Sequence, residues 1–198
     1  MMKKQQGFSL IELIIVVVIL SLLAVTALPR FLNVTEQAED AAVEGVAGGF
    51  AAAVGLVRAQ WEIEGRPSGT SASITMDSTQ IQVNEFGFPT SSASGTNLAP
   101  ESMSASACKA VFDGVMQSPV RSVVSGTDAT DVRYYIGVQS GGTTDSGVDY
   151  LLCSYHLVAT LKLNSSTGLP TGTVDFSVGN SFSYNPATGQ IQVYSNNT

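Results

Sequence analysis

The sequence predicts an α+β protein in which a long N-terminal helix packs on an antiparallel β-sheet. Apolar residues recur with helical spacing from residue 8 to about residue 64, and the breaker-rich segment 65–69 (GRPSG) follows. The last third of the chain alternates apolar and polar residues in short runs between turn signals, as antiparallel strands do. A helix of this length would be about 85 Å long. A domain of this size cannot bury it, so we expect its hydrophobic half to protrude.

The first element is an apolar segment with one acidic residue. The run from Phe8 to Leu28 is roughly 21 residues, or about 31 Å of helix, enough to cross a bilayer. Glu12 lies inside this run, although a charged side chain at the centre of a bilayer helix costs on the order of 3 kcal/mol. A partner charge would offset that cost, and an N-terminal amine exposed by cleavage nearby is the natural candidate.

The residues around Gly7 resemble the signal of type IV prepilins. A short basic leader ends in Gly7 and is followed by Phe8-Ser9-Leu10-Ile11-Glu12, with a proline at position 29. The resemblance implies that a prepilin peptidase cuts between Gly7 and Phe8 and methylates Phe8. It also implies the type IV pilin fold, with residues 1–7 as leader, 8–30 as the hydrophobic assembly helix, 31–64 as the amphipathic half of the helix and 65–198 as the globular head.

Two more general interpretations of the N-terminus remain open. An ordinary secretory signal would end at Val25-Thr26-Ala27, where small residues suit signal peptidase, and would release a soluble exported domain. A plain membrane anchor would keep the whole segment. Neither explains the Gly7-Phe8 pair or Glu12.

Charge predicts the orientation and excludes one class of partner. Lys3 and Lys4 precede the span, whereas mostly acidic residues follow it, so the N-terminus is expected in the cytoplasm and the bulk of the chain outside. The formal net charge is −7, and removal of the leader lysines would make the chain more acidic. Nucleic acid is therefore not an expected partner, since phosphate binding needs clustered Lys and Arg.

The second half of the helix is predicted to be amphipathic. Pro29 lacks a backbone donor and is expected to kink the helix, unless it is merely tolerated at a membrane boundary. Beyond it, spacings of three and four define one apolar face, namely Val34, Ala38, Ala41, Ala42, Val46, Phe50, Ala53, Val54, Val57 and Trp61.

The remaining elements are short. Strands are expected at 73–77, 80–84, 133–139, 150–156, 158–163, 173–178 and 190–194, and a short helix at 108–116 with its cap near Ser106. Residues 86–100 read as a loop rich in Ser, Thr, Gly and Pro. Segment 182–191, and the cysteine-containing helix followed by the YLLCSYHL run at 150–157, resemble the mannose-sensitive haemagglutinin (MSHA) branch of type IV pilins.

The chain contains two cysteines, Cys108 and Cys153. In an exported protein this count predicts a disulfide bond, and only one intrachain pairing exists. A pair of buried free thiols is the alternative. The single histidine, His156, and two cysteines lack zinc-ligand spacing, whereas the acidic turns at Asp128, Asp131, Asp145 and Asp149 leave calcium binding open.

The function implied by the resemblance is assembly rather than catalysis. Glu12 of one subunit would pair with the Phe8 amine of a neighbour, and the expected partners are other pilin subunits, the prepilin peptidase, the inner membrane and the pilus assembly machinery. The filament would be an extracellular, adhesive fimbrium of a Gram-negative-type bacterium, with this chain as major or minor subunit. No cofactor is expected, no motif of an enzyme is found, and His156 is expected to pack in the sheet. A type II secretion pseudopilin is the main alternative.

Overall fold

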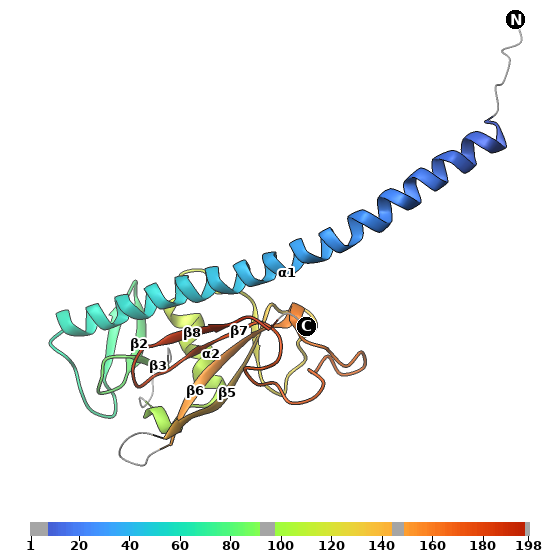
Figure 1. Ribbon diagram of the computed structural model, residues 1–198. Coiled ribbons are helices and arrows are strands. Elements are labelled where there is room, and N and C mark those ends of the chain that lie inside the picture. Colours follow the sequence, from blue (N-terminus) through green and yellow to red (C-terminus); the bar gives the residue numbers. More distant parts are fainter. Residues whose placement is uncertain (1–7, 92–97, 144–148, 197–198) are drawn as a thin grey trace, which may run out of the picture. The chain divides into compact units, whose positions relative to one another are not determined.

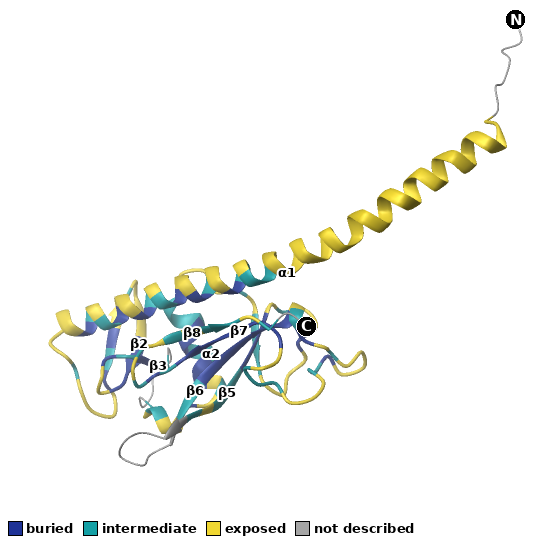
Figure 2. Ribbon diagram, in the orientation of Figure 1, coloured by how far each residue is buried: buried dark blue, intermediate teal, exposed yellow. Residues whose placement is uncertain are grey.

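The computed structural model describes residues 8–91, 98–143 and 149–196 (Figure 1). The leader therefore lies outside the described residues. The chain forms two compact units, Met1–Ala38 and Glu39–Thr198; the second is called the head unit below. Helix α1 (Leu10–Ile63) contributes to both units, and its residues up to Ala38 are exposed (Figure 2). The predicted fold class, a long exposed helix with antiparallel sheets, is confirmed.

The buried face of α1 in the head unit follows a strict alternation of spacings. Its buried side chains are separated by four and three residues in turn, which keeps one narrow stripe against the core: Val43, Ala47, Phe50, Val54, Val57 and Trp61. The last four of these were predicted, whereas Val43 and Ala47 were not. The predicted residues Val34, Ala38 and Ala41 are exposed. The predicted face was therefore rotated at its N-terminal end, because alanines fit either face and do not define it.

Helix α1 ends in a Schellman motif. The Arg66 N–H donates to the Trp61 carbonyl (2.9 Å), and the Gly65 N–H donates to the Glu62 carbonyl (3.3 Å). Gly65 has a φ of +84°, a conformation that suits glycine. The breaker segment thus stops the helix where the sequence predicts.

The head unit contains two sheets. Strands β1 (Ser73–Met76), β2 (Thr79–Val83) and β3 (Pro89–Ser91) form an antiparallel sheet. The β1–β2 turn has positive φ at both Asp77 and Ser78, as tight hairpin turns require. Strand β3 falls in the segment predicted as a loop, because tertiary pairing with β2 overrides its local composition.

The larger sheet has the order β4-β5-β6-β7-β8. It comprises Ser122–Val124, Tyr134–Thr143, Asp149–Leu157, Ser181–Tyr184 and Ile191–Tyr194. All neighbours are antiparallel except β4 and β5, which are parallel. Strand β4 was not predicted, because a three-residue run carries too little alternation to detect.

Two predicted strands are wrong. Residues 158–163 begin with a 3₁₀ turn, η2 (Val158–Thr160), in which the Thr160 hydroxyl donates to the Leu157 carbonyl (2.8 Å). Residues 173–178 form turns in which Asp175 accepts a hydrogen bond from the Ser177 N–H (2.8 Å). In both segments a short polar side chain bonds the nearby backbone, which competes with strand pairing.

The main core lies between the larger sheet and two helices. Helix α2 (Ala105–Val115) is capped by Ser104, two residues before Ser106. The Ser104 hydroxyl oxygen accepts a hydrogen bond from the Ala107 N–H (3.2 Å). Both α2 and the head part of α1 cover the same face of the sheet, because their buried residues share one cluster with inward side chains of β5, β6 and β7. A short 3₁₀ helix, η1 (Pro100–Ser102), leads into α2.

Phe50 lies at the centre of this core. Its ring is within 5.4–5.9 Å, centroid to centroid, of four other buried aromatic rings, those of Phe112, Tyr155, Phe182 and Tyr184. Such contacts contribute beyond area burial alone. The head unit therefore needs the C-terminal part of α1 to complete its core.

Candidate functional site

The candidate site is the N-terminal part of α1. Its 18-residue apolar window has a mean hydropathy of 2.9 and no buried residue, and the helix is long and apolar enough to cross a membrane by length and composition. The exposed fraction of Phe8 is 90%, and the large apolar side chains that follow are at least 48% exposed up to Val34. Burying one such side chain is worth about 1.5–3 kcal/mol. This surface therefore requires an apolar environment or a partner.

Glu12 is held by the residue that starts the helix. The backbone N–H and the hydroxyl of Ser9 both donate to Oε2 of Glu12 (2.8 and 2.7 Å), and the Glu12 N–H donates to the Ser9 hydroxyl oxygen (3.3 Å). This reciprocal arrangement is a capping box. Ser9 was not singled out from the sequence, although the Ser-x-x-Glu pattern at the start of an apolar run is the signal that identifies it.

Other polar side chains of the apolar segment bond within their own helix. The Ser21 hydroxyl donates to the Val17 carbonyl (2.7 Å), and the Thr26 hydroxyl donates to the Leu23 carbonyl (2.9 Å). Hydroxyls that bond back to the preceding turn need no partner from outside. Glu12 differs from these neutral hydroxyl residues because its side chain carries a charge.

Pro29 lies inside α1 rather than at its end. Because proline has no N–H, the helix lacks one backbone hydrogen bond there. Helix α1 continues through this point. The predicted kink at Pro29 stays a prediction.

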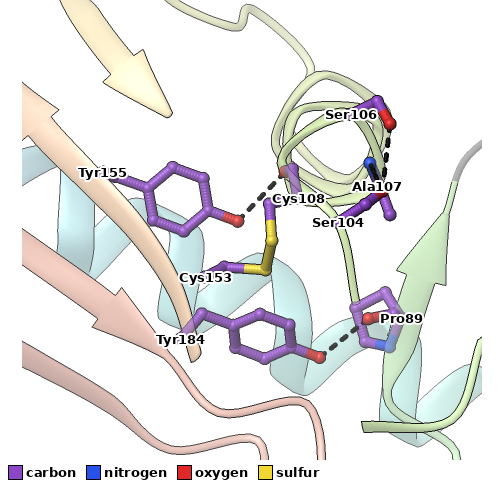
Figure 3. The surroundings of a disulfide bond; sticks show 8 residues. All are labelled: Pro89, Ser104, Ser106, Ala107, Cys108, Cys153, Tyr155 and Tyr184. Carbon is purple, nitrogen blue, oxygen red and sulfur yellow. Dashed lines mark hydrogen bonds between the residues drawn. A yellow bond between two sulfur atoms is a disulfide. The ribbon is translucent and has the colours of Figure 1, made fainter. Parts of the chain in front are cut away.

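The predicted disulfide bond joins helix α2 to strand β6. Cys108 and Cys153 are fully buried, with Cα atoms 5.4 Å apart (Figure 3). Beside it, the Tyr155 hydroxyl donates to the Cys108 carbonyl (3.1 Å), and the Tyr184 hydroxyl donates to the Pro89 carbonyl (2.9 Å). Burial raises the pKa of both tyrosines well above the ordinary value. These neutral hydroxyls tie the sheet to α2 and β3.

His156 packs in the larger sheet, as predicted. Its exposed fraction is 1%, and its ring stacks on Phe176 with centroids 6.1 Å apart. Burial lowers the pKa of His156 to about 4, against a smaller opposing effect of the Val178 backbone and Asp175. A neutral, enclosed imidazole suits a packing role.

The acidic turns form no metal-binding cluster among the described residues. Within the described ranges, no three His, Cys, Asp or Glu side chains are grouped so that they could hold a metal ion. The Asp128 carboxylate accepts hydrogen bonds from the backbone N–H and the hydroxyl of Thr130 (2.9 and 2.7 Å). Asp145, named with it in the calcium hypothesis, lies outside the described residues.

The N-terminus matches a known family model. Residues 2–28 match the prokaryotic N-terminal methylation motif. A curated relative, the type IV narrow pilus major component PilA5 of Thermus thermophilus, is 40% identical over 57 residues, which are 29% of this chain and 49% of the relative. The chain thus spans about half the length of that pilin, and no solved structure gives a significant match.

The match and the geometry concern the same segment. The matched methylation motif ends at Leu28, one residue before Pro29, and covers Phe8, Ser9 and Glu12. Of the predicted site residues, the structure places Phe8 and Glu12 at the start of the exposed helix, whereas Gly7 lies outside the described residues.

Proposed function

We propose that this chain is a structural subunit of a type IV pilus. It is cut between Gly7 and Phe8, methylated on Phe8, held in the inner membrane by α1 and then assembled into an extracellular filament. The observation that carries the proposal is the exposed apolar part of α1, which begins within the methylation motif and continues into a folded head unit with an internal disulfide bond. That combination supplies an anchor before assembly and a packing surface afterwards.

The proposed division of labour follows the chain. Residues 1–7 serve as the leader, residues 8–30 as the hydrophobic assembly helix and residues 31–64 as its amphipathic continuation. Residues 65–198 provide most of the head, whose core also requires the α1 residues from Val43 onward. The proposed filament is MSHA-like and serves in surface attachment, with the 182–191 hairpin as the supporting likeness. That hairpin is formed by β7 and β8, which pair from Ser181–Tyr194 to Tyr184–Ile191.

In the proposed filament, the carboxylate of Glu12 pairs with the amine of Phe8 on a neighbouring subunit. At an effective dielectric constant near 20, two such charges about 4 Å apart attract by about 4 kcal/mol before desolvation is subtracted. The pair therefore sets register, whereas the apolar helix surfaces supply most of the driving force.

Glu12→Ala is expected to lower the amount of pilin in sheared filaments while leaving the mature N-terminus intact. Glu36→Ala is the matched control, because Glu36 is an exposed acidic residue on the same helix but outside the apolar window. Filament yields are measured against the subunit pool in the membrane. Normal pilus number and length in Glu12→Ala would refute the pairing.

Gly7→Val is expected to block cleavage, because the added side chain occupies the position next to the scissile bond. The variant should keep its leader, which intact mass and N-terminal sequencing of protein from the native envelope detect. Gln6→Ala serves as the control and should be processed normally. A normally trimmed Gly7→Val protein would disprove the assigned cleavage point.

The wild-type N-terminus is the first test of the proposal. A chain that starts at Phe8 with one added methyl group supports the pilin pathway, and imaging then distinguishes a long pilus from the short pseudopilus of a type II secretion system. A start at Leu28 would instead indicate a soluble exported domain.

A further inference from the structure

We propose that Ser9 is a positioning residue for the assembly contact: it holds one carboxylate oxygen of Glu12 within its own chain and leaves the other for the amine of a neighbouring subunit. The inference rests on the proposed function and assigns a role to a residue outside the Phe8–Glu12 pair. It follows from which oxygen of Glu12 is used.

Both donors of Ser9 meet the same oxygen. The backbone N–H lies 2.8 Å and the hydroxyl oxygen 2.7 Å from Oε2 of Glu12. The other oxygen, Oε1, receives no hydrogen bond from any residue that the structure describes. A carboxylate has about four lone-pair sites, two on each oxygen. Oε2 is thus satisfied within the chain, and Oε1 can accept an ammonium group.

The arrangement survives the proposed cleavage. Every donor and acceptor in it belongs to Ser9 or Glu12, and both residues lie after the Gly7–Phe8 bond. Cleavage leaves Phe8 as the single residue ahead of the cap. The new amine, on Phe8, therefore lies one residue before the cap residue Ser9.

The hydrogen bonds from Ser9 to Glu12 would also stabilise the carboxylate before assembly. An unpaired carboxylate in an apolar medium is costly, and hydrogen bonds to the charged form reduce that cost. Ser9 supplies two such bonds while the subunit waits in the membrane. Assembly then adds a bond at Oε1 without breaking those at Oε2, so the neighbour meets a carboxylate that is already oriented.

A role as a simple helix cap makes a different prediction. Glycine at the N-cap position costs only a few tenths of a kcal/mol relative to serine, whereas alanine costs about 1 kcal/mol. Glycine nevertheless lacks the hydroxyl that donates to Oε2. Threonine keeps the hydroxyl and a good cap. Ser9→Thr, Ser9→Gly and Ser9→Ala therefore separate carboxylate positioning from capping.

The experiment uses the full chain in its native envelope. For each variant, pilin in sheared filaments is measured relative to pilin in the membrane, and the N-terminus is read by intact mass. Ser9→Thr should assemble like the wild type. Ser9→Gly and Ser9→Ala should both fall roughly tenfold in that ratio, the effect of losing one hydrogen bond to a charged group. All three should start at methylated Phe8.

Several results would overturn the inference. Normal assembly of Ser9→Gly would reduce Ser9 to a helix cap, and a defect in Ser9→Thr equal to that in Ser9→Gly would show that the hydroxyl is irrelevant. Uncleaved Ser9→Gly would place the effect on processing instead. Failure of the proposed function is a separate outcome, seen in the wild type as a different N-terminus or as an absence of filaments.

Discussion

Replacing Phe50 with alanine tests how far the head unit depends on α1. Phe50 is fully buried and touches four aromatic rings at 5.4–5.9 Å between centroids. Removing a buried phenylalanine side chain typically costs about 3–5 kcal/mol, and the number of ring contacts favours the upper part of that range. For a chain of this size, that loss lowers the midpoint of thermal unfolding by about 8–16 °C.

A graded pair of variants makes the test sharper. Phe50→Leu keeps most of the buried volume but loses the ring contacts, so it should cost about 1–2 kcal/mol. Leu56→Ala is the matched control, because Leu56 lies on the same helix with an exposed fraction of 60% and should change stability by less than about 0.5 kcal/mol.

The assay is thermal unfolding of the full chain in detergent, followed by near-ultraviolet circular dichroism of the buried tyrosines. That signal reports packing in the head unit rather than helicity of the exposed segment. A shift below 3 °C for Phe50→Ala, or an equal shift for Leu56→Ala, would refute the view that this stripe of α1 completes the core.

Two further predictions concern the head unit. Cys108→Ala/Cys153→Ala should lower the free energy of unfolding by about 4 kcal/mol in the chain-entropy model, because the bond closes a loop of 45 residues; added reductant should then cause no further shift. Burial lowers the pKa of His156 to about 4, so its stabilising effect is present above pH 6.5 and is lost as the pH falls toward 4. Denaturant titrations at a series of pH values measure this loss of unfolding free energy, and His156→Gln should reduce it by about 3 kcal/mol. An unchanged dependence of stability on pH in this variant would contradict the burial argument.

The exposed apolar helix with Glu12 near its start could be predicted from the sequence because its information is local. The apolar run, the Gly7-Phe8 pair and Glu12 are contiguous, and no tertiary contact is needed to recognise them. The spacing of Ser9 and Glu12, three residues apart, likewise indicates a capping box. The sequence pattern does not show that both donors of Ser9 bond the same oxygen of Glu12, Oε2, because this depends on side-chain geometry.

The head unit was predicted less evenly. The long strands β5 and β6 and the β7–β8 hairpin have clear alternation and turn signals, so their sequences indicated them. Residues 158–163 and 173–178 carry similar composition, yet Thr160 and Asp175 bond the nearby backbone and turn the chain. Short-range hydrogen bonds of this kind compete with pairing, and composition alone does not show which one prevails.

By itself, the sequence determined the long helix, its end at the Gly65 segment, the apolar N-terminal segment and the single possible disulfide pairing, because each depends on local composition or on a count. Only the tertiary structure decided which face of α1 is buried, how the strands divide into two sheets and that β4 runs parallel to β5. Alanines and short polar runs suit several environments equally. Packing against the aromatic core around Phe50 determines where these segments lie, and the residues of that core come from segments far apart in the chain.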